Sequence, residues 1–311
     1  MLSVILPAYN EEPNIRPVTQ RLGEILQAAE IPYELLFVND GSSDGTWDSI
    51  CTESQGDAAV RGLCFSRNFG KESAIFAGIS AASGDCCVVM DCDLQHPPEK
   101  IVEMYRLWEQ GFEVIEGVKS DRGRESAAHG FAARCFYRII SRSTGMDLMN
   151  ASDFRLLDRK AMDSLLSMPE QHAFFRALSS WIGFRTATVE FEVQERQAGE
   201  SKWSTGGLFR YALSSITSFT SFPLHAITFM GILTLLVSLI MGGIALYQKF
   251  TGAALGGFTT VIILQLFTAS LIMVSLGILG YYLGKVYDEI KGRPRYIISD
   301  CCGKPGKERT P

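Results

Sequence analysis

Short apolar segments alternate with helical patterns along the first 120 residues of the chain. Several of these segments are continuous apolar runs, which is typical of strands that are buried on both faces of a sheet. Between the first two, apolar residues recur on one helical face, with Asn10 as the expected N-cap and Pro13 in the first turn. The alternation predicts an α/β fold, with a mostly parallel sheet and helices on both faces. The predicted strands are Leu2–Leu6, Glu34–Val38, Gly62–Phe65, Cys86–Met90 and Glu113–Val118.

Polar segments follow four of these predicted strands directly, and they read PAYNEE, NDGSSDGT, SRNFGKES and DCDLQHPPE. Ligands of parallel sheets bind beyond the carboxyl ends of the strands, so we expect the four loops to form one binding edge. Neither G-x-G-x-x-G nor G-x-x-x-x-G-K-[ST] occurs in these loops. Their absence argues against a dinucleotide-dependent dehydrogenase and against a P-loop nucleotide hydrolase.

Two long runs without a charged residue lie further along, at Leu224–Gln248 and Phe250–Gly284. Each run exceeds the roughly 20 apolar residues that cross a bilayer as a helix. The alternative is a pair of buried core helices, but core helices are usually shorter and carry a polar face. The sequence therefore predicts two transmembrane helices.

The charged residues that flank these runs predict an orientation. The linker between the runs carries only Lys249, whereas cationic residues are concentrated on both outer flanks, so the positive-inside rule predicts that both ends are cytoplasmic. We also expect no cleavable signal, because no positively charged start precedes an apolar stretch at Leu2. The flanking cations are Lys202, Arg210, Lys285, Lys291, Arg293 and Arg295.

The patterns divide the chain into four expected parts. Residues 1–207 form a cytoplasmic domain, with a helix over Ser126–Ser143 and a β-rich stretch at Thr186–Val193. Residues 208–223 mix apolar and hydroxyl side chains and are expected to form an interfacial amphipathic helix, although an ordinary domain helix fits equally. Residues 224–284 form the transmembrane hairpin, and 285–311 form a cytoplasmic tail that is loose from Cys301 onward.

Two aspartates, Asp91 and Asp93, stand at the end of a predicted buried strand in MDCDLQHPPE. Carboxylates in this arrangement can bind a hard cation such as Mg²⁺ or Mn²⁺, which prefers oxygen ligands and adds phosphate oxygens to its shell. A bare D-x-D also begins many ordinary turns. Its position after a strand, with Pro97 and Pro98 at a helix start, favours the metal site.

Two other polar loops have both a functional and an ordinary interpretation. Asp40 and Ser42 in NDGSSDGT could contact a base or ribose, or the loop could be a solvated turn with Asp44 as N-cap. The loop RQAGESK offers donors suited to a pyrophosphate or a lipid phosphate, and could otherwise be a solvated basic surface. Its donors are Arg196, Ser201 and Lys202.

Composition narrows the class of protein further. Eight cysteines occur without a C-x-x-C pair, which favours reduced thiols over a disulfide framework or a zinc site. The net charge of −5 gives no basic footprint for nucleic acid, so no nucleic-acid partner is expected.

Six ordered motifs resemble those of glycosyltransferase family 2. They are SVILPAYNEEPNI, VNDGSSDGT, FSRNFGKESAIFAGISAASGD, DCDLQHPPE, SDFRLLDR and ERQAGESKW. The likeness runs from Leu2 to about Pro223 and is greatest to the polyprenyl-phosphate sugar transferases, which include dolichyl-phosphate mannose synthases and bactoprenol glucosyltransferases. The paired apolar runs and YDEIKGRPRY are similar to the bactoprenol branch. Two positions differ from the usual pattern: Cys92 stands where alanine is familiar in the family, and His96 stands where aspartate is often found. Neither is expected to bind the metal.

The resemblance implies a GT-A fold, which is Rossmann-like, and a set of site residues. Asp91, Asp93 and Gln95 would hold the metal, and Asp153 in SDFRL would occupy the catalytic carboxylate position. The phosphates would be bound by Arg196, Ser201 and Lys202. The nucleotide would be bound by Pro7, Tyr9, Glu12, Asp40, Ser42 and Lys71.

The resemblance also implies a reaction and its partners. A hexose, with glucose from UDP-glucose expected, would pass with inversion to undecaprenyl phosphate at the cytoplasmic face of the bacterial inner membrane, with Mg²⁺ or Mn²⁺ as cofactor. A homo-oligomer such as a tetramer is expected, because glycines in the apolar runs would permit close approach of helices from different subunits. These glycines are Gly242, Gly243, Gly277, Gly280 and Gly284. Two alternatives are a processive glycan synthase and a non-catalytic membrane scaffold that binds nucleotide sugars. The absence of a Q-x-x-R-W motif and the presence of the acidic and basic site residues argue against them.

Overall fold

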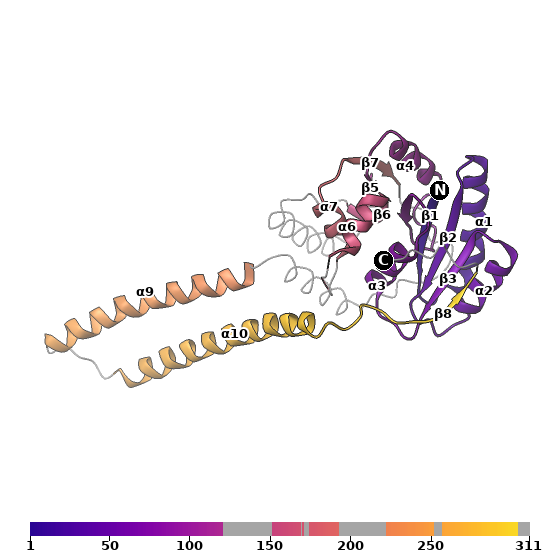
Figure 1. Cartoon of the computed structure of the whole chain (residues 1–311). Helices are drawn as coiled ribbons and strands as arrows, with labels where there is room; N and C mark the ends of the chain where they lie inside the picture. The colour runs from indigo at the N-terminus through magenta and orange to yellow at the C-terminus, as the bar shows by residue number, and fades with distance from the viewer. Residues whose placement is uncertain (121–150, 169, 171–173, 193–221, 252–256, 304–311) are drawn as a thin grey trace. The chain divides into compact units, whose positions relative to one another are not determined.

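The computed structural model describes the chain except residues 121–150, 169, 171–173, 193–221, 252–256 and 304–311 (Figure 1). The chain forms two compact units, Met1–Leu208 with Pro294–Pro311, and Phe209–Arg293. The predicted helix over Ser126–Ser143, residues 208–221 of the predicted interfacial segment 208–223, and the RQAGESK loop lie outside the described residues.

The first unit contains an eight-stranded mixed sheet of order β7-β5-β6-β4-β1-β2-β3-β8. Strands β1, β2, β3 and β4 are mutually parallel, as are β5 and β7, whereas β6 and β8 run antiparallel to their neighbours. All predicted strands are present, with ends that differ by one or two residues. The strands are β1 Leu2–Ala8, β2 Tyr33–Asn39, β3 Val60–Phe65, β4 Cys86–Val89, β5 Val114–Lys119, β6 Ala151–Asp158, β7 Thr186–Phe191 and β8 Ile298–Cys302.

Helices cover both faces of this sheet, as the continuous apolar strands predict. Alternate residues of β2 pack on opposite faces of the sheet: Leu35 and Phe37 belong to one buried cluster, and Leu36 and Val38 belong to another. The first cluster includes the apolar face of α1, and the second includes Ala74 and Ala77 of α3. The helices are α1 Glu12–Ala28, α2 Thr46–Gly56, α3 Lys71–Ala81, α4 Glu99–Glu109, α6 Arg159–Leu166 and α7 Phe175–Trp181.

The start of α1 differs from the prediction. Pro13 lies in the first turn as expected, but Glu11 rather than Asn10 occupies the N-cap position. Asn10 has a left-handed backbone (φ 54°), and its Oδ1 accepts a hydrogen bond of 2.8 Å from the Ser43 amide in the next loop. Asparagine tolerates this conformation better than most residues, so Asn10 joins two site loops instead of capping its own helix.

The C-terminal segment also differs, because Cys301 and Cys302 belong to strand β8 and not to a loose tail. Strand β8 pairs antiparallel with β3, with Leu63 opposite Cys301. Its approach is fixed by Tyr296, whose ring stacks on Phe65 at 5.1 Å between centroids. A short segment that contains Asp300 carries little strand signal of its own, so the free edge of β3 decides its conformation.

The second unit contains two helices, α9 Phe222–Phe250 and α10 Phe258–Ile290, of 29 and 33 residues. Both are long and apolar enough to cross a membrane, over Ala226–Ile244 and Phe267–Ile290, and neither span is buried within the structure. They match the two predicted apolar runs. Large apolar side chains such as Leu239, Ile240 and Met273 are exposed on them, in contrast to the buried core of the first unit.

Candidate active site

The loops that follow β1, β2, β3 and β4 meet at the carboxyl edge of the parallel strands, as predicted. The first two are joined by Asn10, whose amide donates to Ser42 Oγ at 2.9 Å, and by Glu12, whose carboxylate accepts from the Gly45 amide at 3.1 Å. Two predicted nucleotide-binding residues lie beside them, with Pro7 half-buried in β1 and Tyr9 41% exposed. These hydrogen bonds join the two loops that are predicted to bind the nucleotide.

Asp40 joins the second loop to the third. Its side chain is buried, and its Oδ1 accepts a hydrogen bond of 2.7 Å from the Phe69 amide while its Oδ2 accepts one of 3.0 Å from the Gly70 amide. Burial raises the pKa of Asp40, and the two amides offset part of that rise. Gly70 has φ +95°, a conformation that favours glycine, so this contact fixes the backbone where α3 begins.

The aspartates of the fourth loop lie directly beyond β4. Asp93 is nearly buried, and its Oδ1 accepts a hydrogen bond of 3.1 Å from the Gln95 amide. Leu94, between them, has a left-handed backbone (φ 55°), which turns the loop sharply after the second aspartate. Asp91 is 31% exposed at the side chain and is thus open to a ligand.

Cys92 and His96 pack into the protein beneath these carboxylates. The Cys92 thiol is buried and lies 3.4 Å from the Pro7 carbonyl oxygen. His96 is also buried and stacks on Phe154, with 5.0 Å between ring centroids. Burial lowers the pKa of His96, which favours the neutral imidazole. Both residues therefore pack within the protein beside the loop, and their exclusion from the metal site stays a prediction.

Asp153 reaches the same edge through strand pairing. Strand β6 runs antiparallel to β4, with Val89 opposite Arg155. Asp91 follows the end of β4 by two residues and Asp153 precedes Arg155 by two, so both lie just past this last pair, although 61 residues lie between them in the chain. The structure thus brings the predicted catalytic carboxylate and the first predicted metal ligand together.

Lys71 lies between these two carboxylates. Its Nζ is 2.7 Å from Asp91 Oδ1 and 2.9 Å from Asp153 Oδ2. Burial would lower the pKa of Lys71, but the two carboxylates outweigh it and raise that pKa, so the ammonium is retained. Burial would likewise raise the pKa of Asp91, which Lys71 holds below its usual value. The sequence predicted Lys71 near the nucleotide, and the structure adds these two ion pairs.

Arg176 of α7 is a site residue that the sequence did not single out. Its Nη2 lies 3.0 Å from Asp153 Oδ1, whereas Lys71 contacts the other oxygen of that carboxylate. Burial would raise the pKa of Asp153, but Arg176 and Lys71 hold it well below its usual range. Helix α7 is itself fixed to β6 by the fully buried Arg155, which donates a hydrogen bond of 2.7 Å to Ser179.

Glu72 is the second such residue. Its carboxylate accepts a hydrogen bond of 2.8 Å from the Phe175 amide and so joins α3 to α7. Burial, followed by the charge of Asp153, raises the pKa of Glu72 to about 7. No local signal in FGKES or HAFFRALSSW distinguishes Glu72 or Arg176 from ordinary helix residues, because their roles depend on a strand and a helix that are distant in sequence.

The residues at this edge fit a divalent cation. Asp91 and Asp93 supply the carboxylates that suit a Mg²⁺ or Mn²⁺ site, which commonly takes one or two protein carboxylates and completes its shell with phosphate oxygens and water. In the described part of the chain, no group of three or more His, Cys, Asp or Glu side chains could hold a metal ion by itself. The predicted phosphate-binding residues Arg196, Ser201 and Lys202 lie outside that part.

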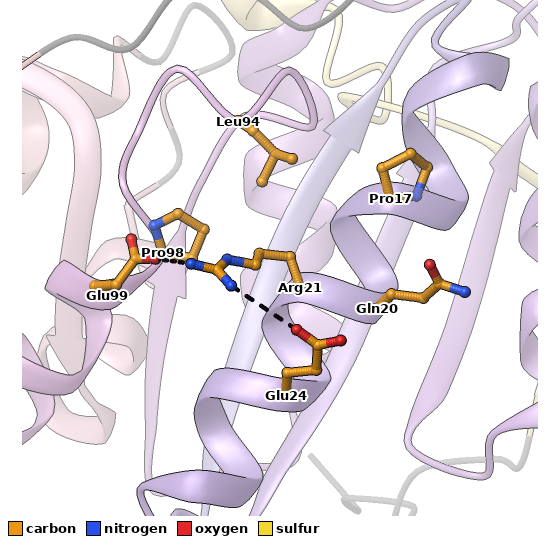
Figure 2. Close-up of a pocket in the computed structure, with 7 residues that line it drawn as sticks. All are labelled: Pro17, Gln20, Arg21, Glu24, Leu94, Pro98 and Glu99. Carbon is orange, nitrogen blue, oxygen red and sulfur yellow. Dashed lines mark hydrogen bonds and ion pairs between the residues drawn. The ribbon is translucent and has the colours of Figure 1, made fainter.

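A separate hollow of about 460 Å³ lies between α1 and the start of α4 (Figure 2). Its charged side chains pair with one another, since Arg21 contacts Glu99 at 2.5 Å and Glu24 at 3.8 Å. None of the predicted site residues that the structure describes lines it. The chemistry-bearing residues are therefore at the sheet edge and not in this hollow.

Comparison with known proteins identifies the family of this chain. The sequence profile of Glycosyl transferase family 2 matches residues 3–166. The uncharacterized glycosyltransferase YkcC of Bacillus subtilis (strain 168) is 39% identical over 307 residues, which cover 98% of this chain and 95% of the relative. The SfII prophage-derived bactoprenol glucosyl transferase of Shigella flexneri is 34% identical over 299 residues, which cover 96% of this chain and 97% of the relative.

A solved structure supports the fold. Mannosyl-3-phosphoglycerate synthase from Rubrobacter xylanophilus superposes with a TM-score of 0.50 at 15% identity, covering 70% of this chain and 72% of that one. This likeness bears on the fold alone, and it agrees with the GT-A architecture that the motifs predict. With the profile match and two relatives aligned over nearly their whole length, the chain belongs to glycosyltransferase family 2.

Proposed function

We propose that this glycosyltransferase transfers a hexose, glucose from UDP-glucose, to undecaprenyl phosphate at the cytoplasmic face of the membrane, with inversion at the anomeric carbon. The observation that carries the proposal is the cluster of Asp91, Asp153 and Lys71 at the carboxyl edge of the sheet. The SfII prophage-derived bactoprenol glucosyl transferase of Shigella flexneri, which aligns over nearly all of both chains, supports the proposed acceptor.

Cleavage of the donor builds negative charge on the departing nucleoside diphosphate. A divalent cation held by Asp91 and Asp93 would neutralise that charge when bound. Asp40, Glu12 and Ser42 hold the loops that would receive the nucleoside, through the hydrogen bonds described above. The charge of a cation held by Asp91 and Asp93 would stabilise the leaving group without any rearrangement as the reaction proceeds.

Asp153 acts by orienting the acceptor rather than by removing its proton. Its two ion pairs keep the pKa of Asp153 far below neutral, which makes it a weak base. The acceptor does not need a strong base, because a phosphate monoester has a second pKa near 6 and is largely ionised at pH 7. Asp153 and Arg176 would therefore set the position from which the acceptor oxygen attacks the sugar.

The two apolar helices would anchor this site beside the acceptor, whose polyprenyl tail stays in the bilayer. Strand β8 supports a hairpin topology, because it follows α10 and pairs with β3 of the sheet that precedes α9. This pairing would return the chain to the side from which it left, which favours an even number of crossings. An epitope inserted in the 252–256 segment should be digested by protease added outside spheroplasts, and protection of that epitope would contradict the hairpin.

A product assay tests the reaction. Purified full-length protein is incubated with undecaprenyl phosphate, Mn²⁺ or Mg²⁺ and a panel of labelled UDP- and GDP-sugars, and the lipid fraction is identified by mass. We expect one hexose on the lipid, with UDP-glucose as the best donor. A polymer would favour a processive synthase, and donor binding without any product or hydrolysis would favour a non-catalytic scaffold.

A further inference from the structure

The most unusual contact of the site is the position of the Lys71 ammonium. Its Nζ lies 2.7 Å from Oδ1 and 3.0 Å from Oδ2 of Asp91, so it contacts both oxygens of the predicted metal ligand. The same ammonium is 2.9 Å from Asp153 Oδ2. A cation thus already lies against the carboxylate that would bind the metal.

Lys71 and a metal ion would compete for this carboxylate. Mg²⁺ binds carboxylate oxygens at about 2.0–2.1 Å, and an ammonium that contacts both oxygens of Asp91 covers the same face. Two cations in contact with one carboxylate also repel each other. The metal can therefore reach Asp91 fully only if the ammonium withdraws.

The backbone of Lys71 is held in place, so withdrawal involves the side chain. Asp40 fixes the Phe69 and Gly70 amides immediately before it, and α3 begins at Lys71 itself. The side chain is 37% exposed and its ammonium is carried on a flexible four-carbon stem, so it can adopt another rotamer. A retracted ammonium would remain at the edge where a donor diphosphate brings new negative charge.

We propose that Lys71 is a positioning residue that occupies the metal position of Asp91 before the cofactor binds, and that it turns to the donor diphosphate once the metal has displaced it. This inference rests on the proposed metal-dependent transfer. Lys71 thus has two partners one after the other, first the Asp91 carboxylate and then the donor diphosphate. Asp91 is thereby kept from being left without a cationic partner when no metal is bound.

The test measures Mn²⁺ binding by calorimetry on the full-length protein, without donor or acceptor. Removing the competing ammonium in Lys71→Met should tighten Mn²⁺ binding by about tenfold or more, since a charge within 4–6 Å shifts the equilibria of a carboxylate by that order. UDP binding to the Mn²⁺-loaded variant should weaken by a similar factor. A purely structural role would weaken both. Unchanged or weaker Mn²⁺ binding would overturn the proposal, as would UDP binding that does not weaken.

Two further variants keep the test decisive. Lys71→Arg retains the charge and should therefore leave the Mn²⁺ affinity closer to that of wild type than Lys71→Met does. If Lys71→Met does not fold, Lys71→Gln takes its place, and tighter Mn²⁺ binding is expected of that variant instead. Lys160→Met is the matched control, because Lys160 follows β6 at the opposite edge of the sheet and is 76% exposed. It should leave both affinities unchanged, and a shift equal to that of Lys71→Met would overturn the assignment to Lys71.

Asp91→Ala separates failure of this inference from failure of the proposed function. If wild type and Asp91→Ala bind Mn²⁺ equally weakly, no metal site exists at Asp91 and the proposed metal-dependent chemistry fails with it. If Asp91→Ala abolishes Mn²⁺ binding while Lys71→Met leaves it unchanged, only the role of Lys71 is overturned.

Discussion

The parallel strands of the sheet and its two long-range antiparallel strands contribute to the site in different ways. Strands β1, β2, β3 and β4 come from the first 89 residues, and each presents its polar loop at the same edge. Strands β6 and β8 join from distant parts of the chain, where β6 brings Asp153 to the Lys71 ammonium that also contacts Asp91, and β8 closes the free edge of β3. The parallel half thus supplies binding loops, and the antiparallel additions complete and enclose them.

The strongest test of the parallel half is Asp91→Ala. We expect turnover with saturating donor to fall by about 10²–10³-fold, because the site loses a fixed charge that acts on the leaving group. The protein should stay folded, since Asp91 is partly exposed. The control is Asp163→Ala, which removes an exposed helical carboxylate and should leave turnover unchanged. Full activity of Asp91→Ala in unchanged metal would refute the assigned role.

The corresponding test of the antiparallel half is Asp153→Asn, measured as turnover at saturating donor. We expect a loss of about 10–10²-fold, smaller than for Asp91→Ala, because misplacement of a reacting group costs up to that order. Lys71 and Arg176 would each lose their shared anionic partner. An unaltered rate would remove Asp153 from the reaction, and a loss greater than that of Asp91→Ala would mean that Asp153 does more than orient the acceptor.

The role of β8 can be tested through Tyr296→Ala. The substitution removes the stack on Phe65 and should lower the free energy of unfolding by about 1–3 kcal/mol, with earlier proteolytic release of the C-terminus. Denaturant unfolding of the detergent-solubilised protein measures the first effect. Ile297→Ala is the matched control, because Ile297 is 52% exposed and adjacent. Equal effects of the two substitutions would argue that β8 does not depend on this stack.

The smallest expected effect concerns Glu72, which joins the two halves through α3 and α7. Its pKa is about 7 in the folded protein against 4.5 for the free side chain, so the folded state retains a proton that the unfolded state loses. Stability from this group therefore falls as pH rises from about 4.5 to 7. Glu72→Gln should reduce that slope, measured as the thermal midpoint at pH 5 and pH 7. Parallel curves for the two proteins would show that Glu72 is ionised as usual.

Local sequence predicted the parallel half well because its signals lie within single segments. Apolar runs mark β1 and β4, and the polar residues directly after them include Asp91 and Asp93. The position of Asp153 beside Asp91 was implied only by the family motif SDFRL, since the physical cause is an antiparallel register. Arg176 and Glu72 carried no signal, because each acquires its partner only when α7 packs against α3 and β6.

The amino-acid sequence by itself determined the α/β class, the position of the acidic loop after β4, and two helices apolar enough for a bilayer, because periodicity and run length are local properties. Tertiary structure decided that β8 returns to the sheet, that Asn10 joins two loops instead of capping a helix, and that Lys71 contacts both Asp91 and Asp153. These contacts join residues 20 to 240 positions apart, and only the register of strands and the packing of helices bring such residues within hydrogen-bonding distance.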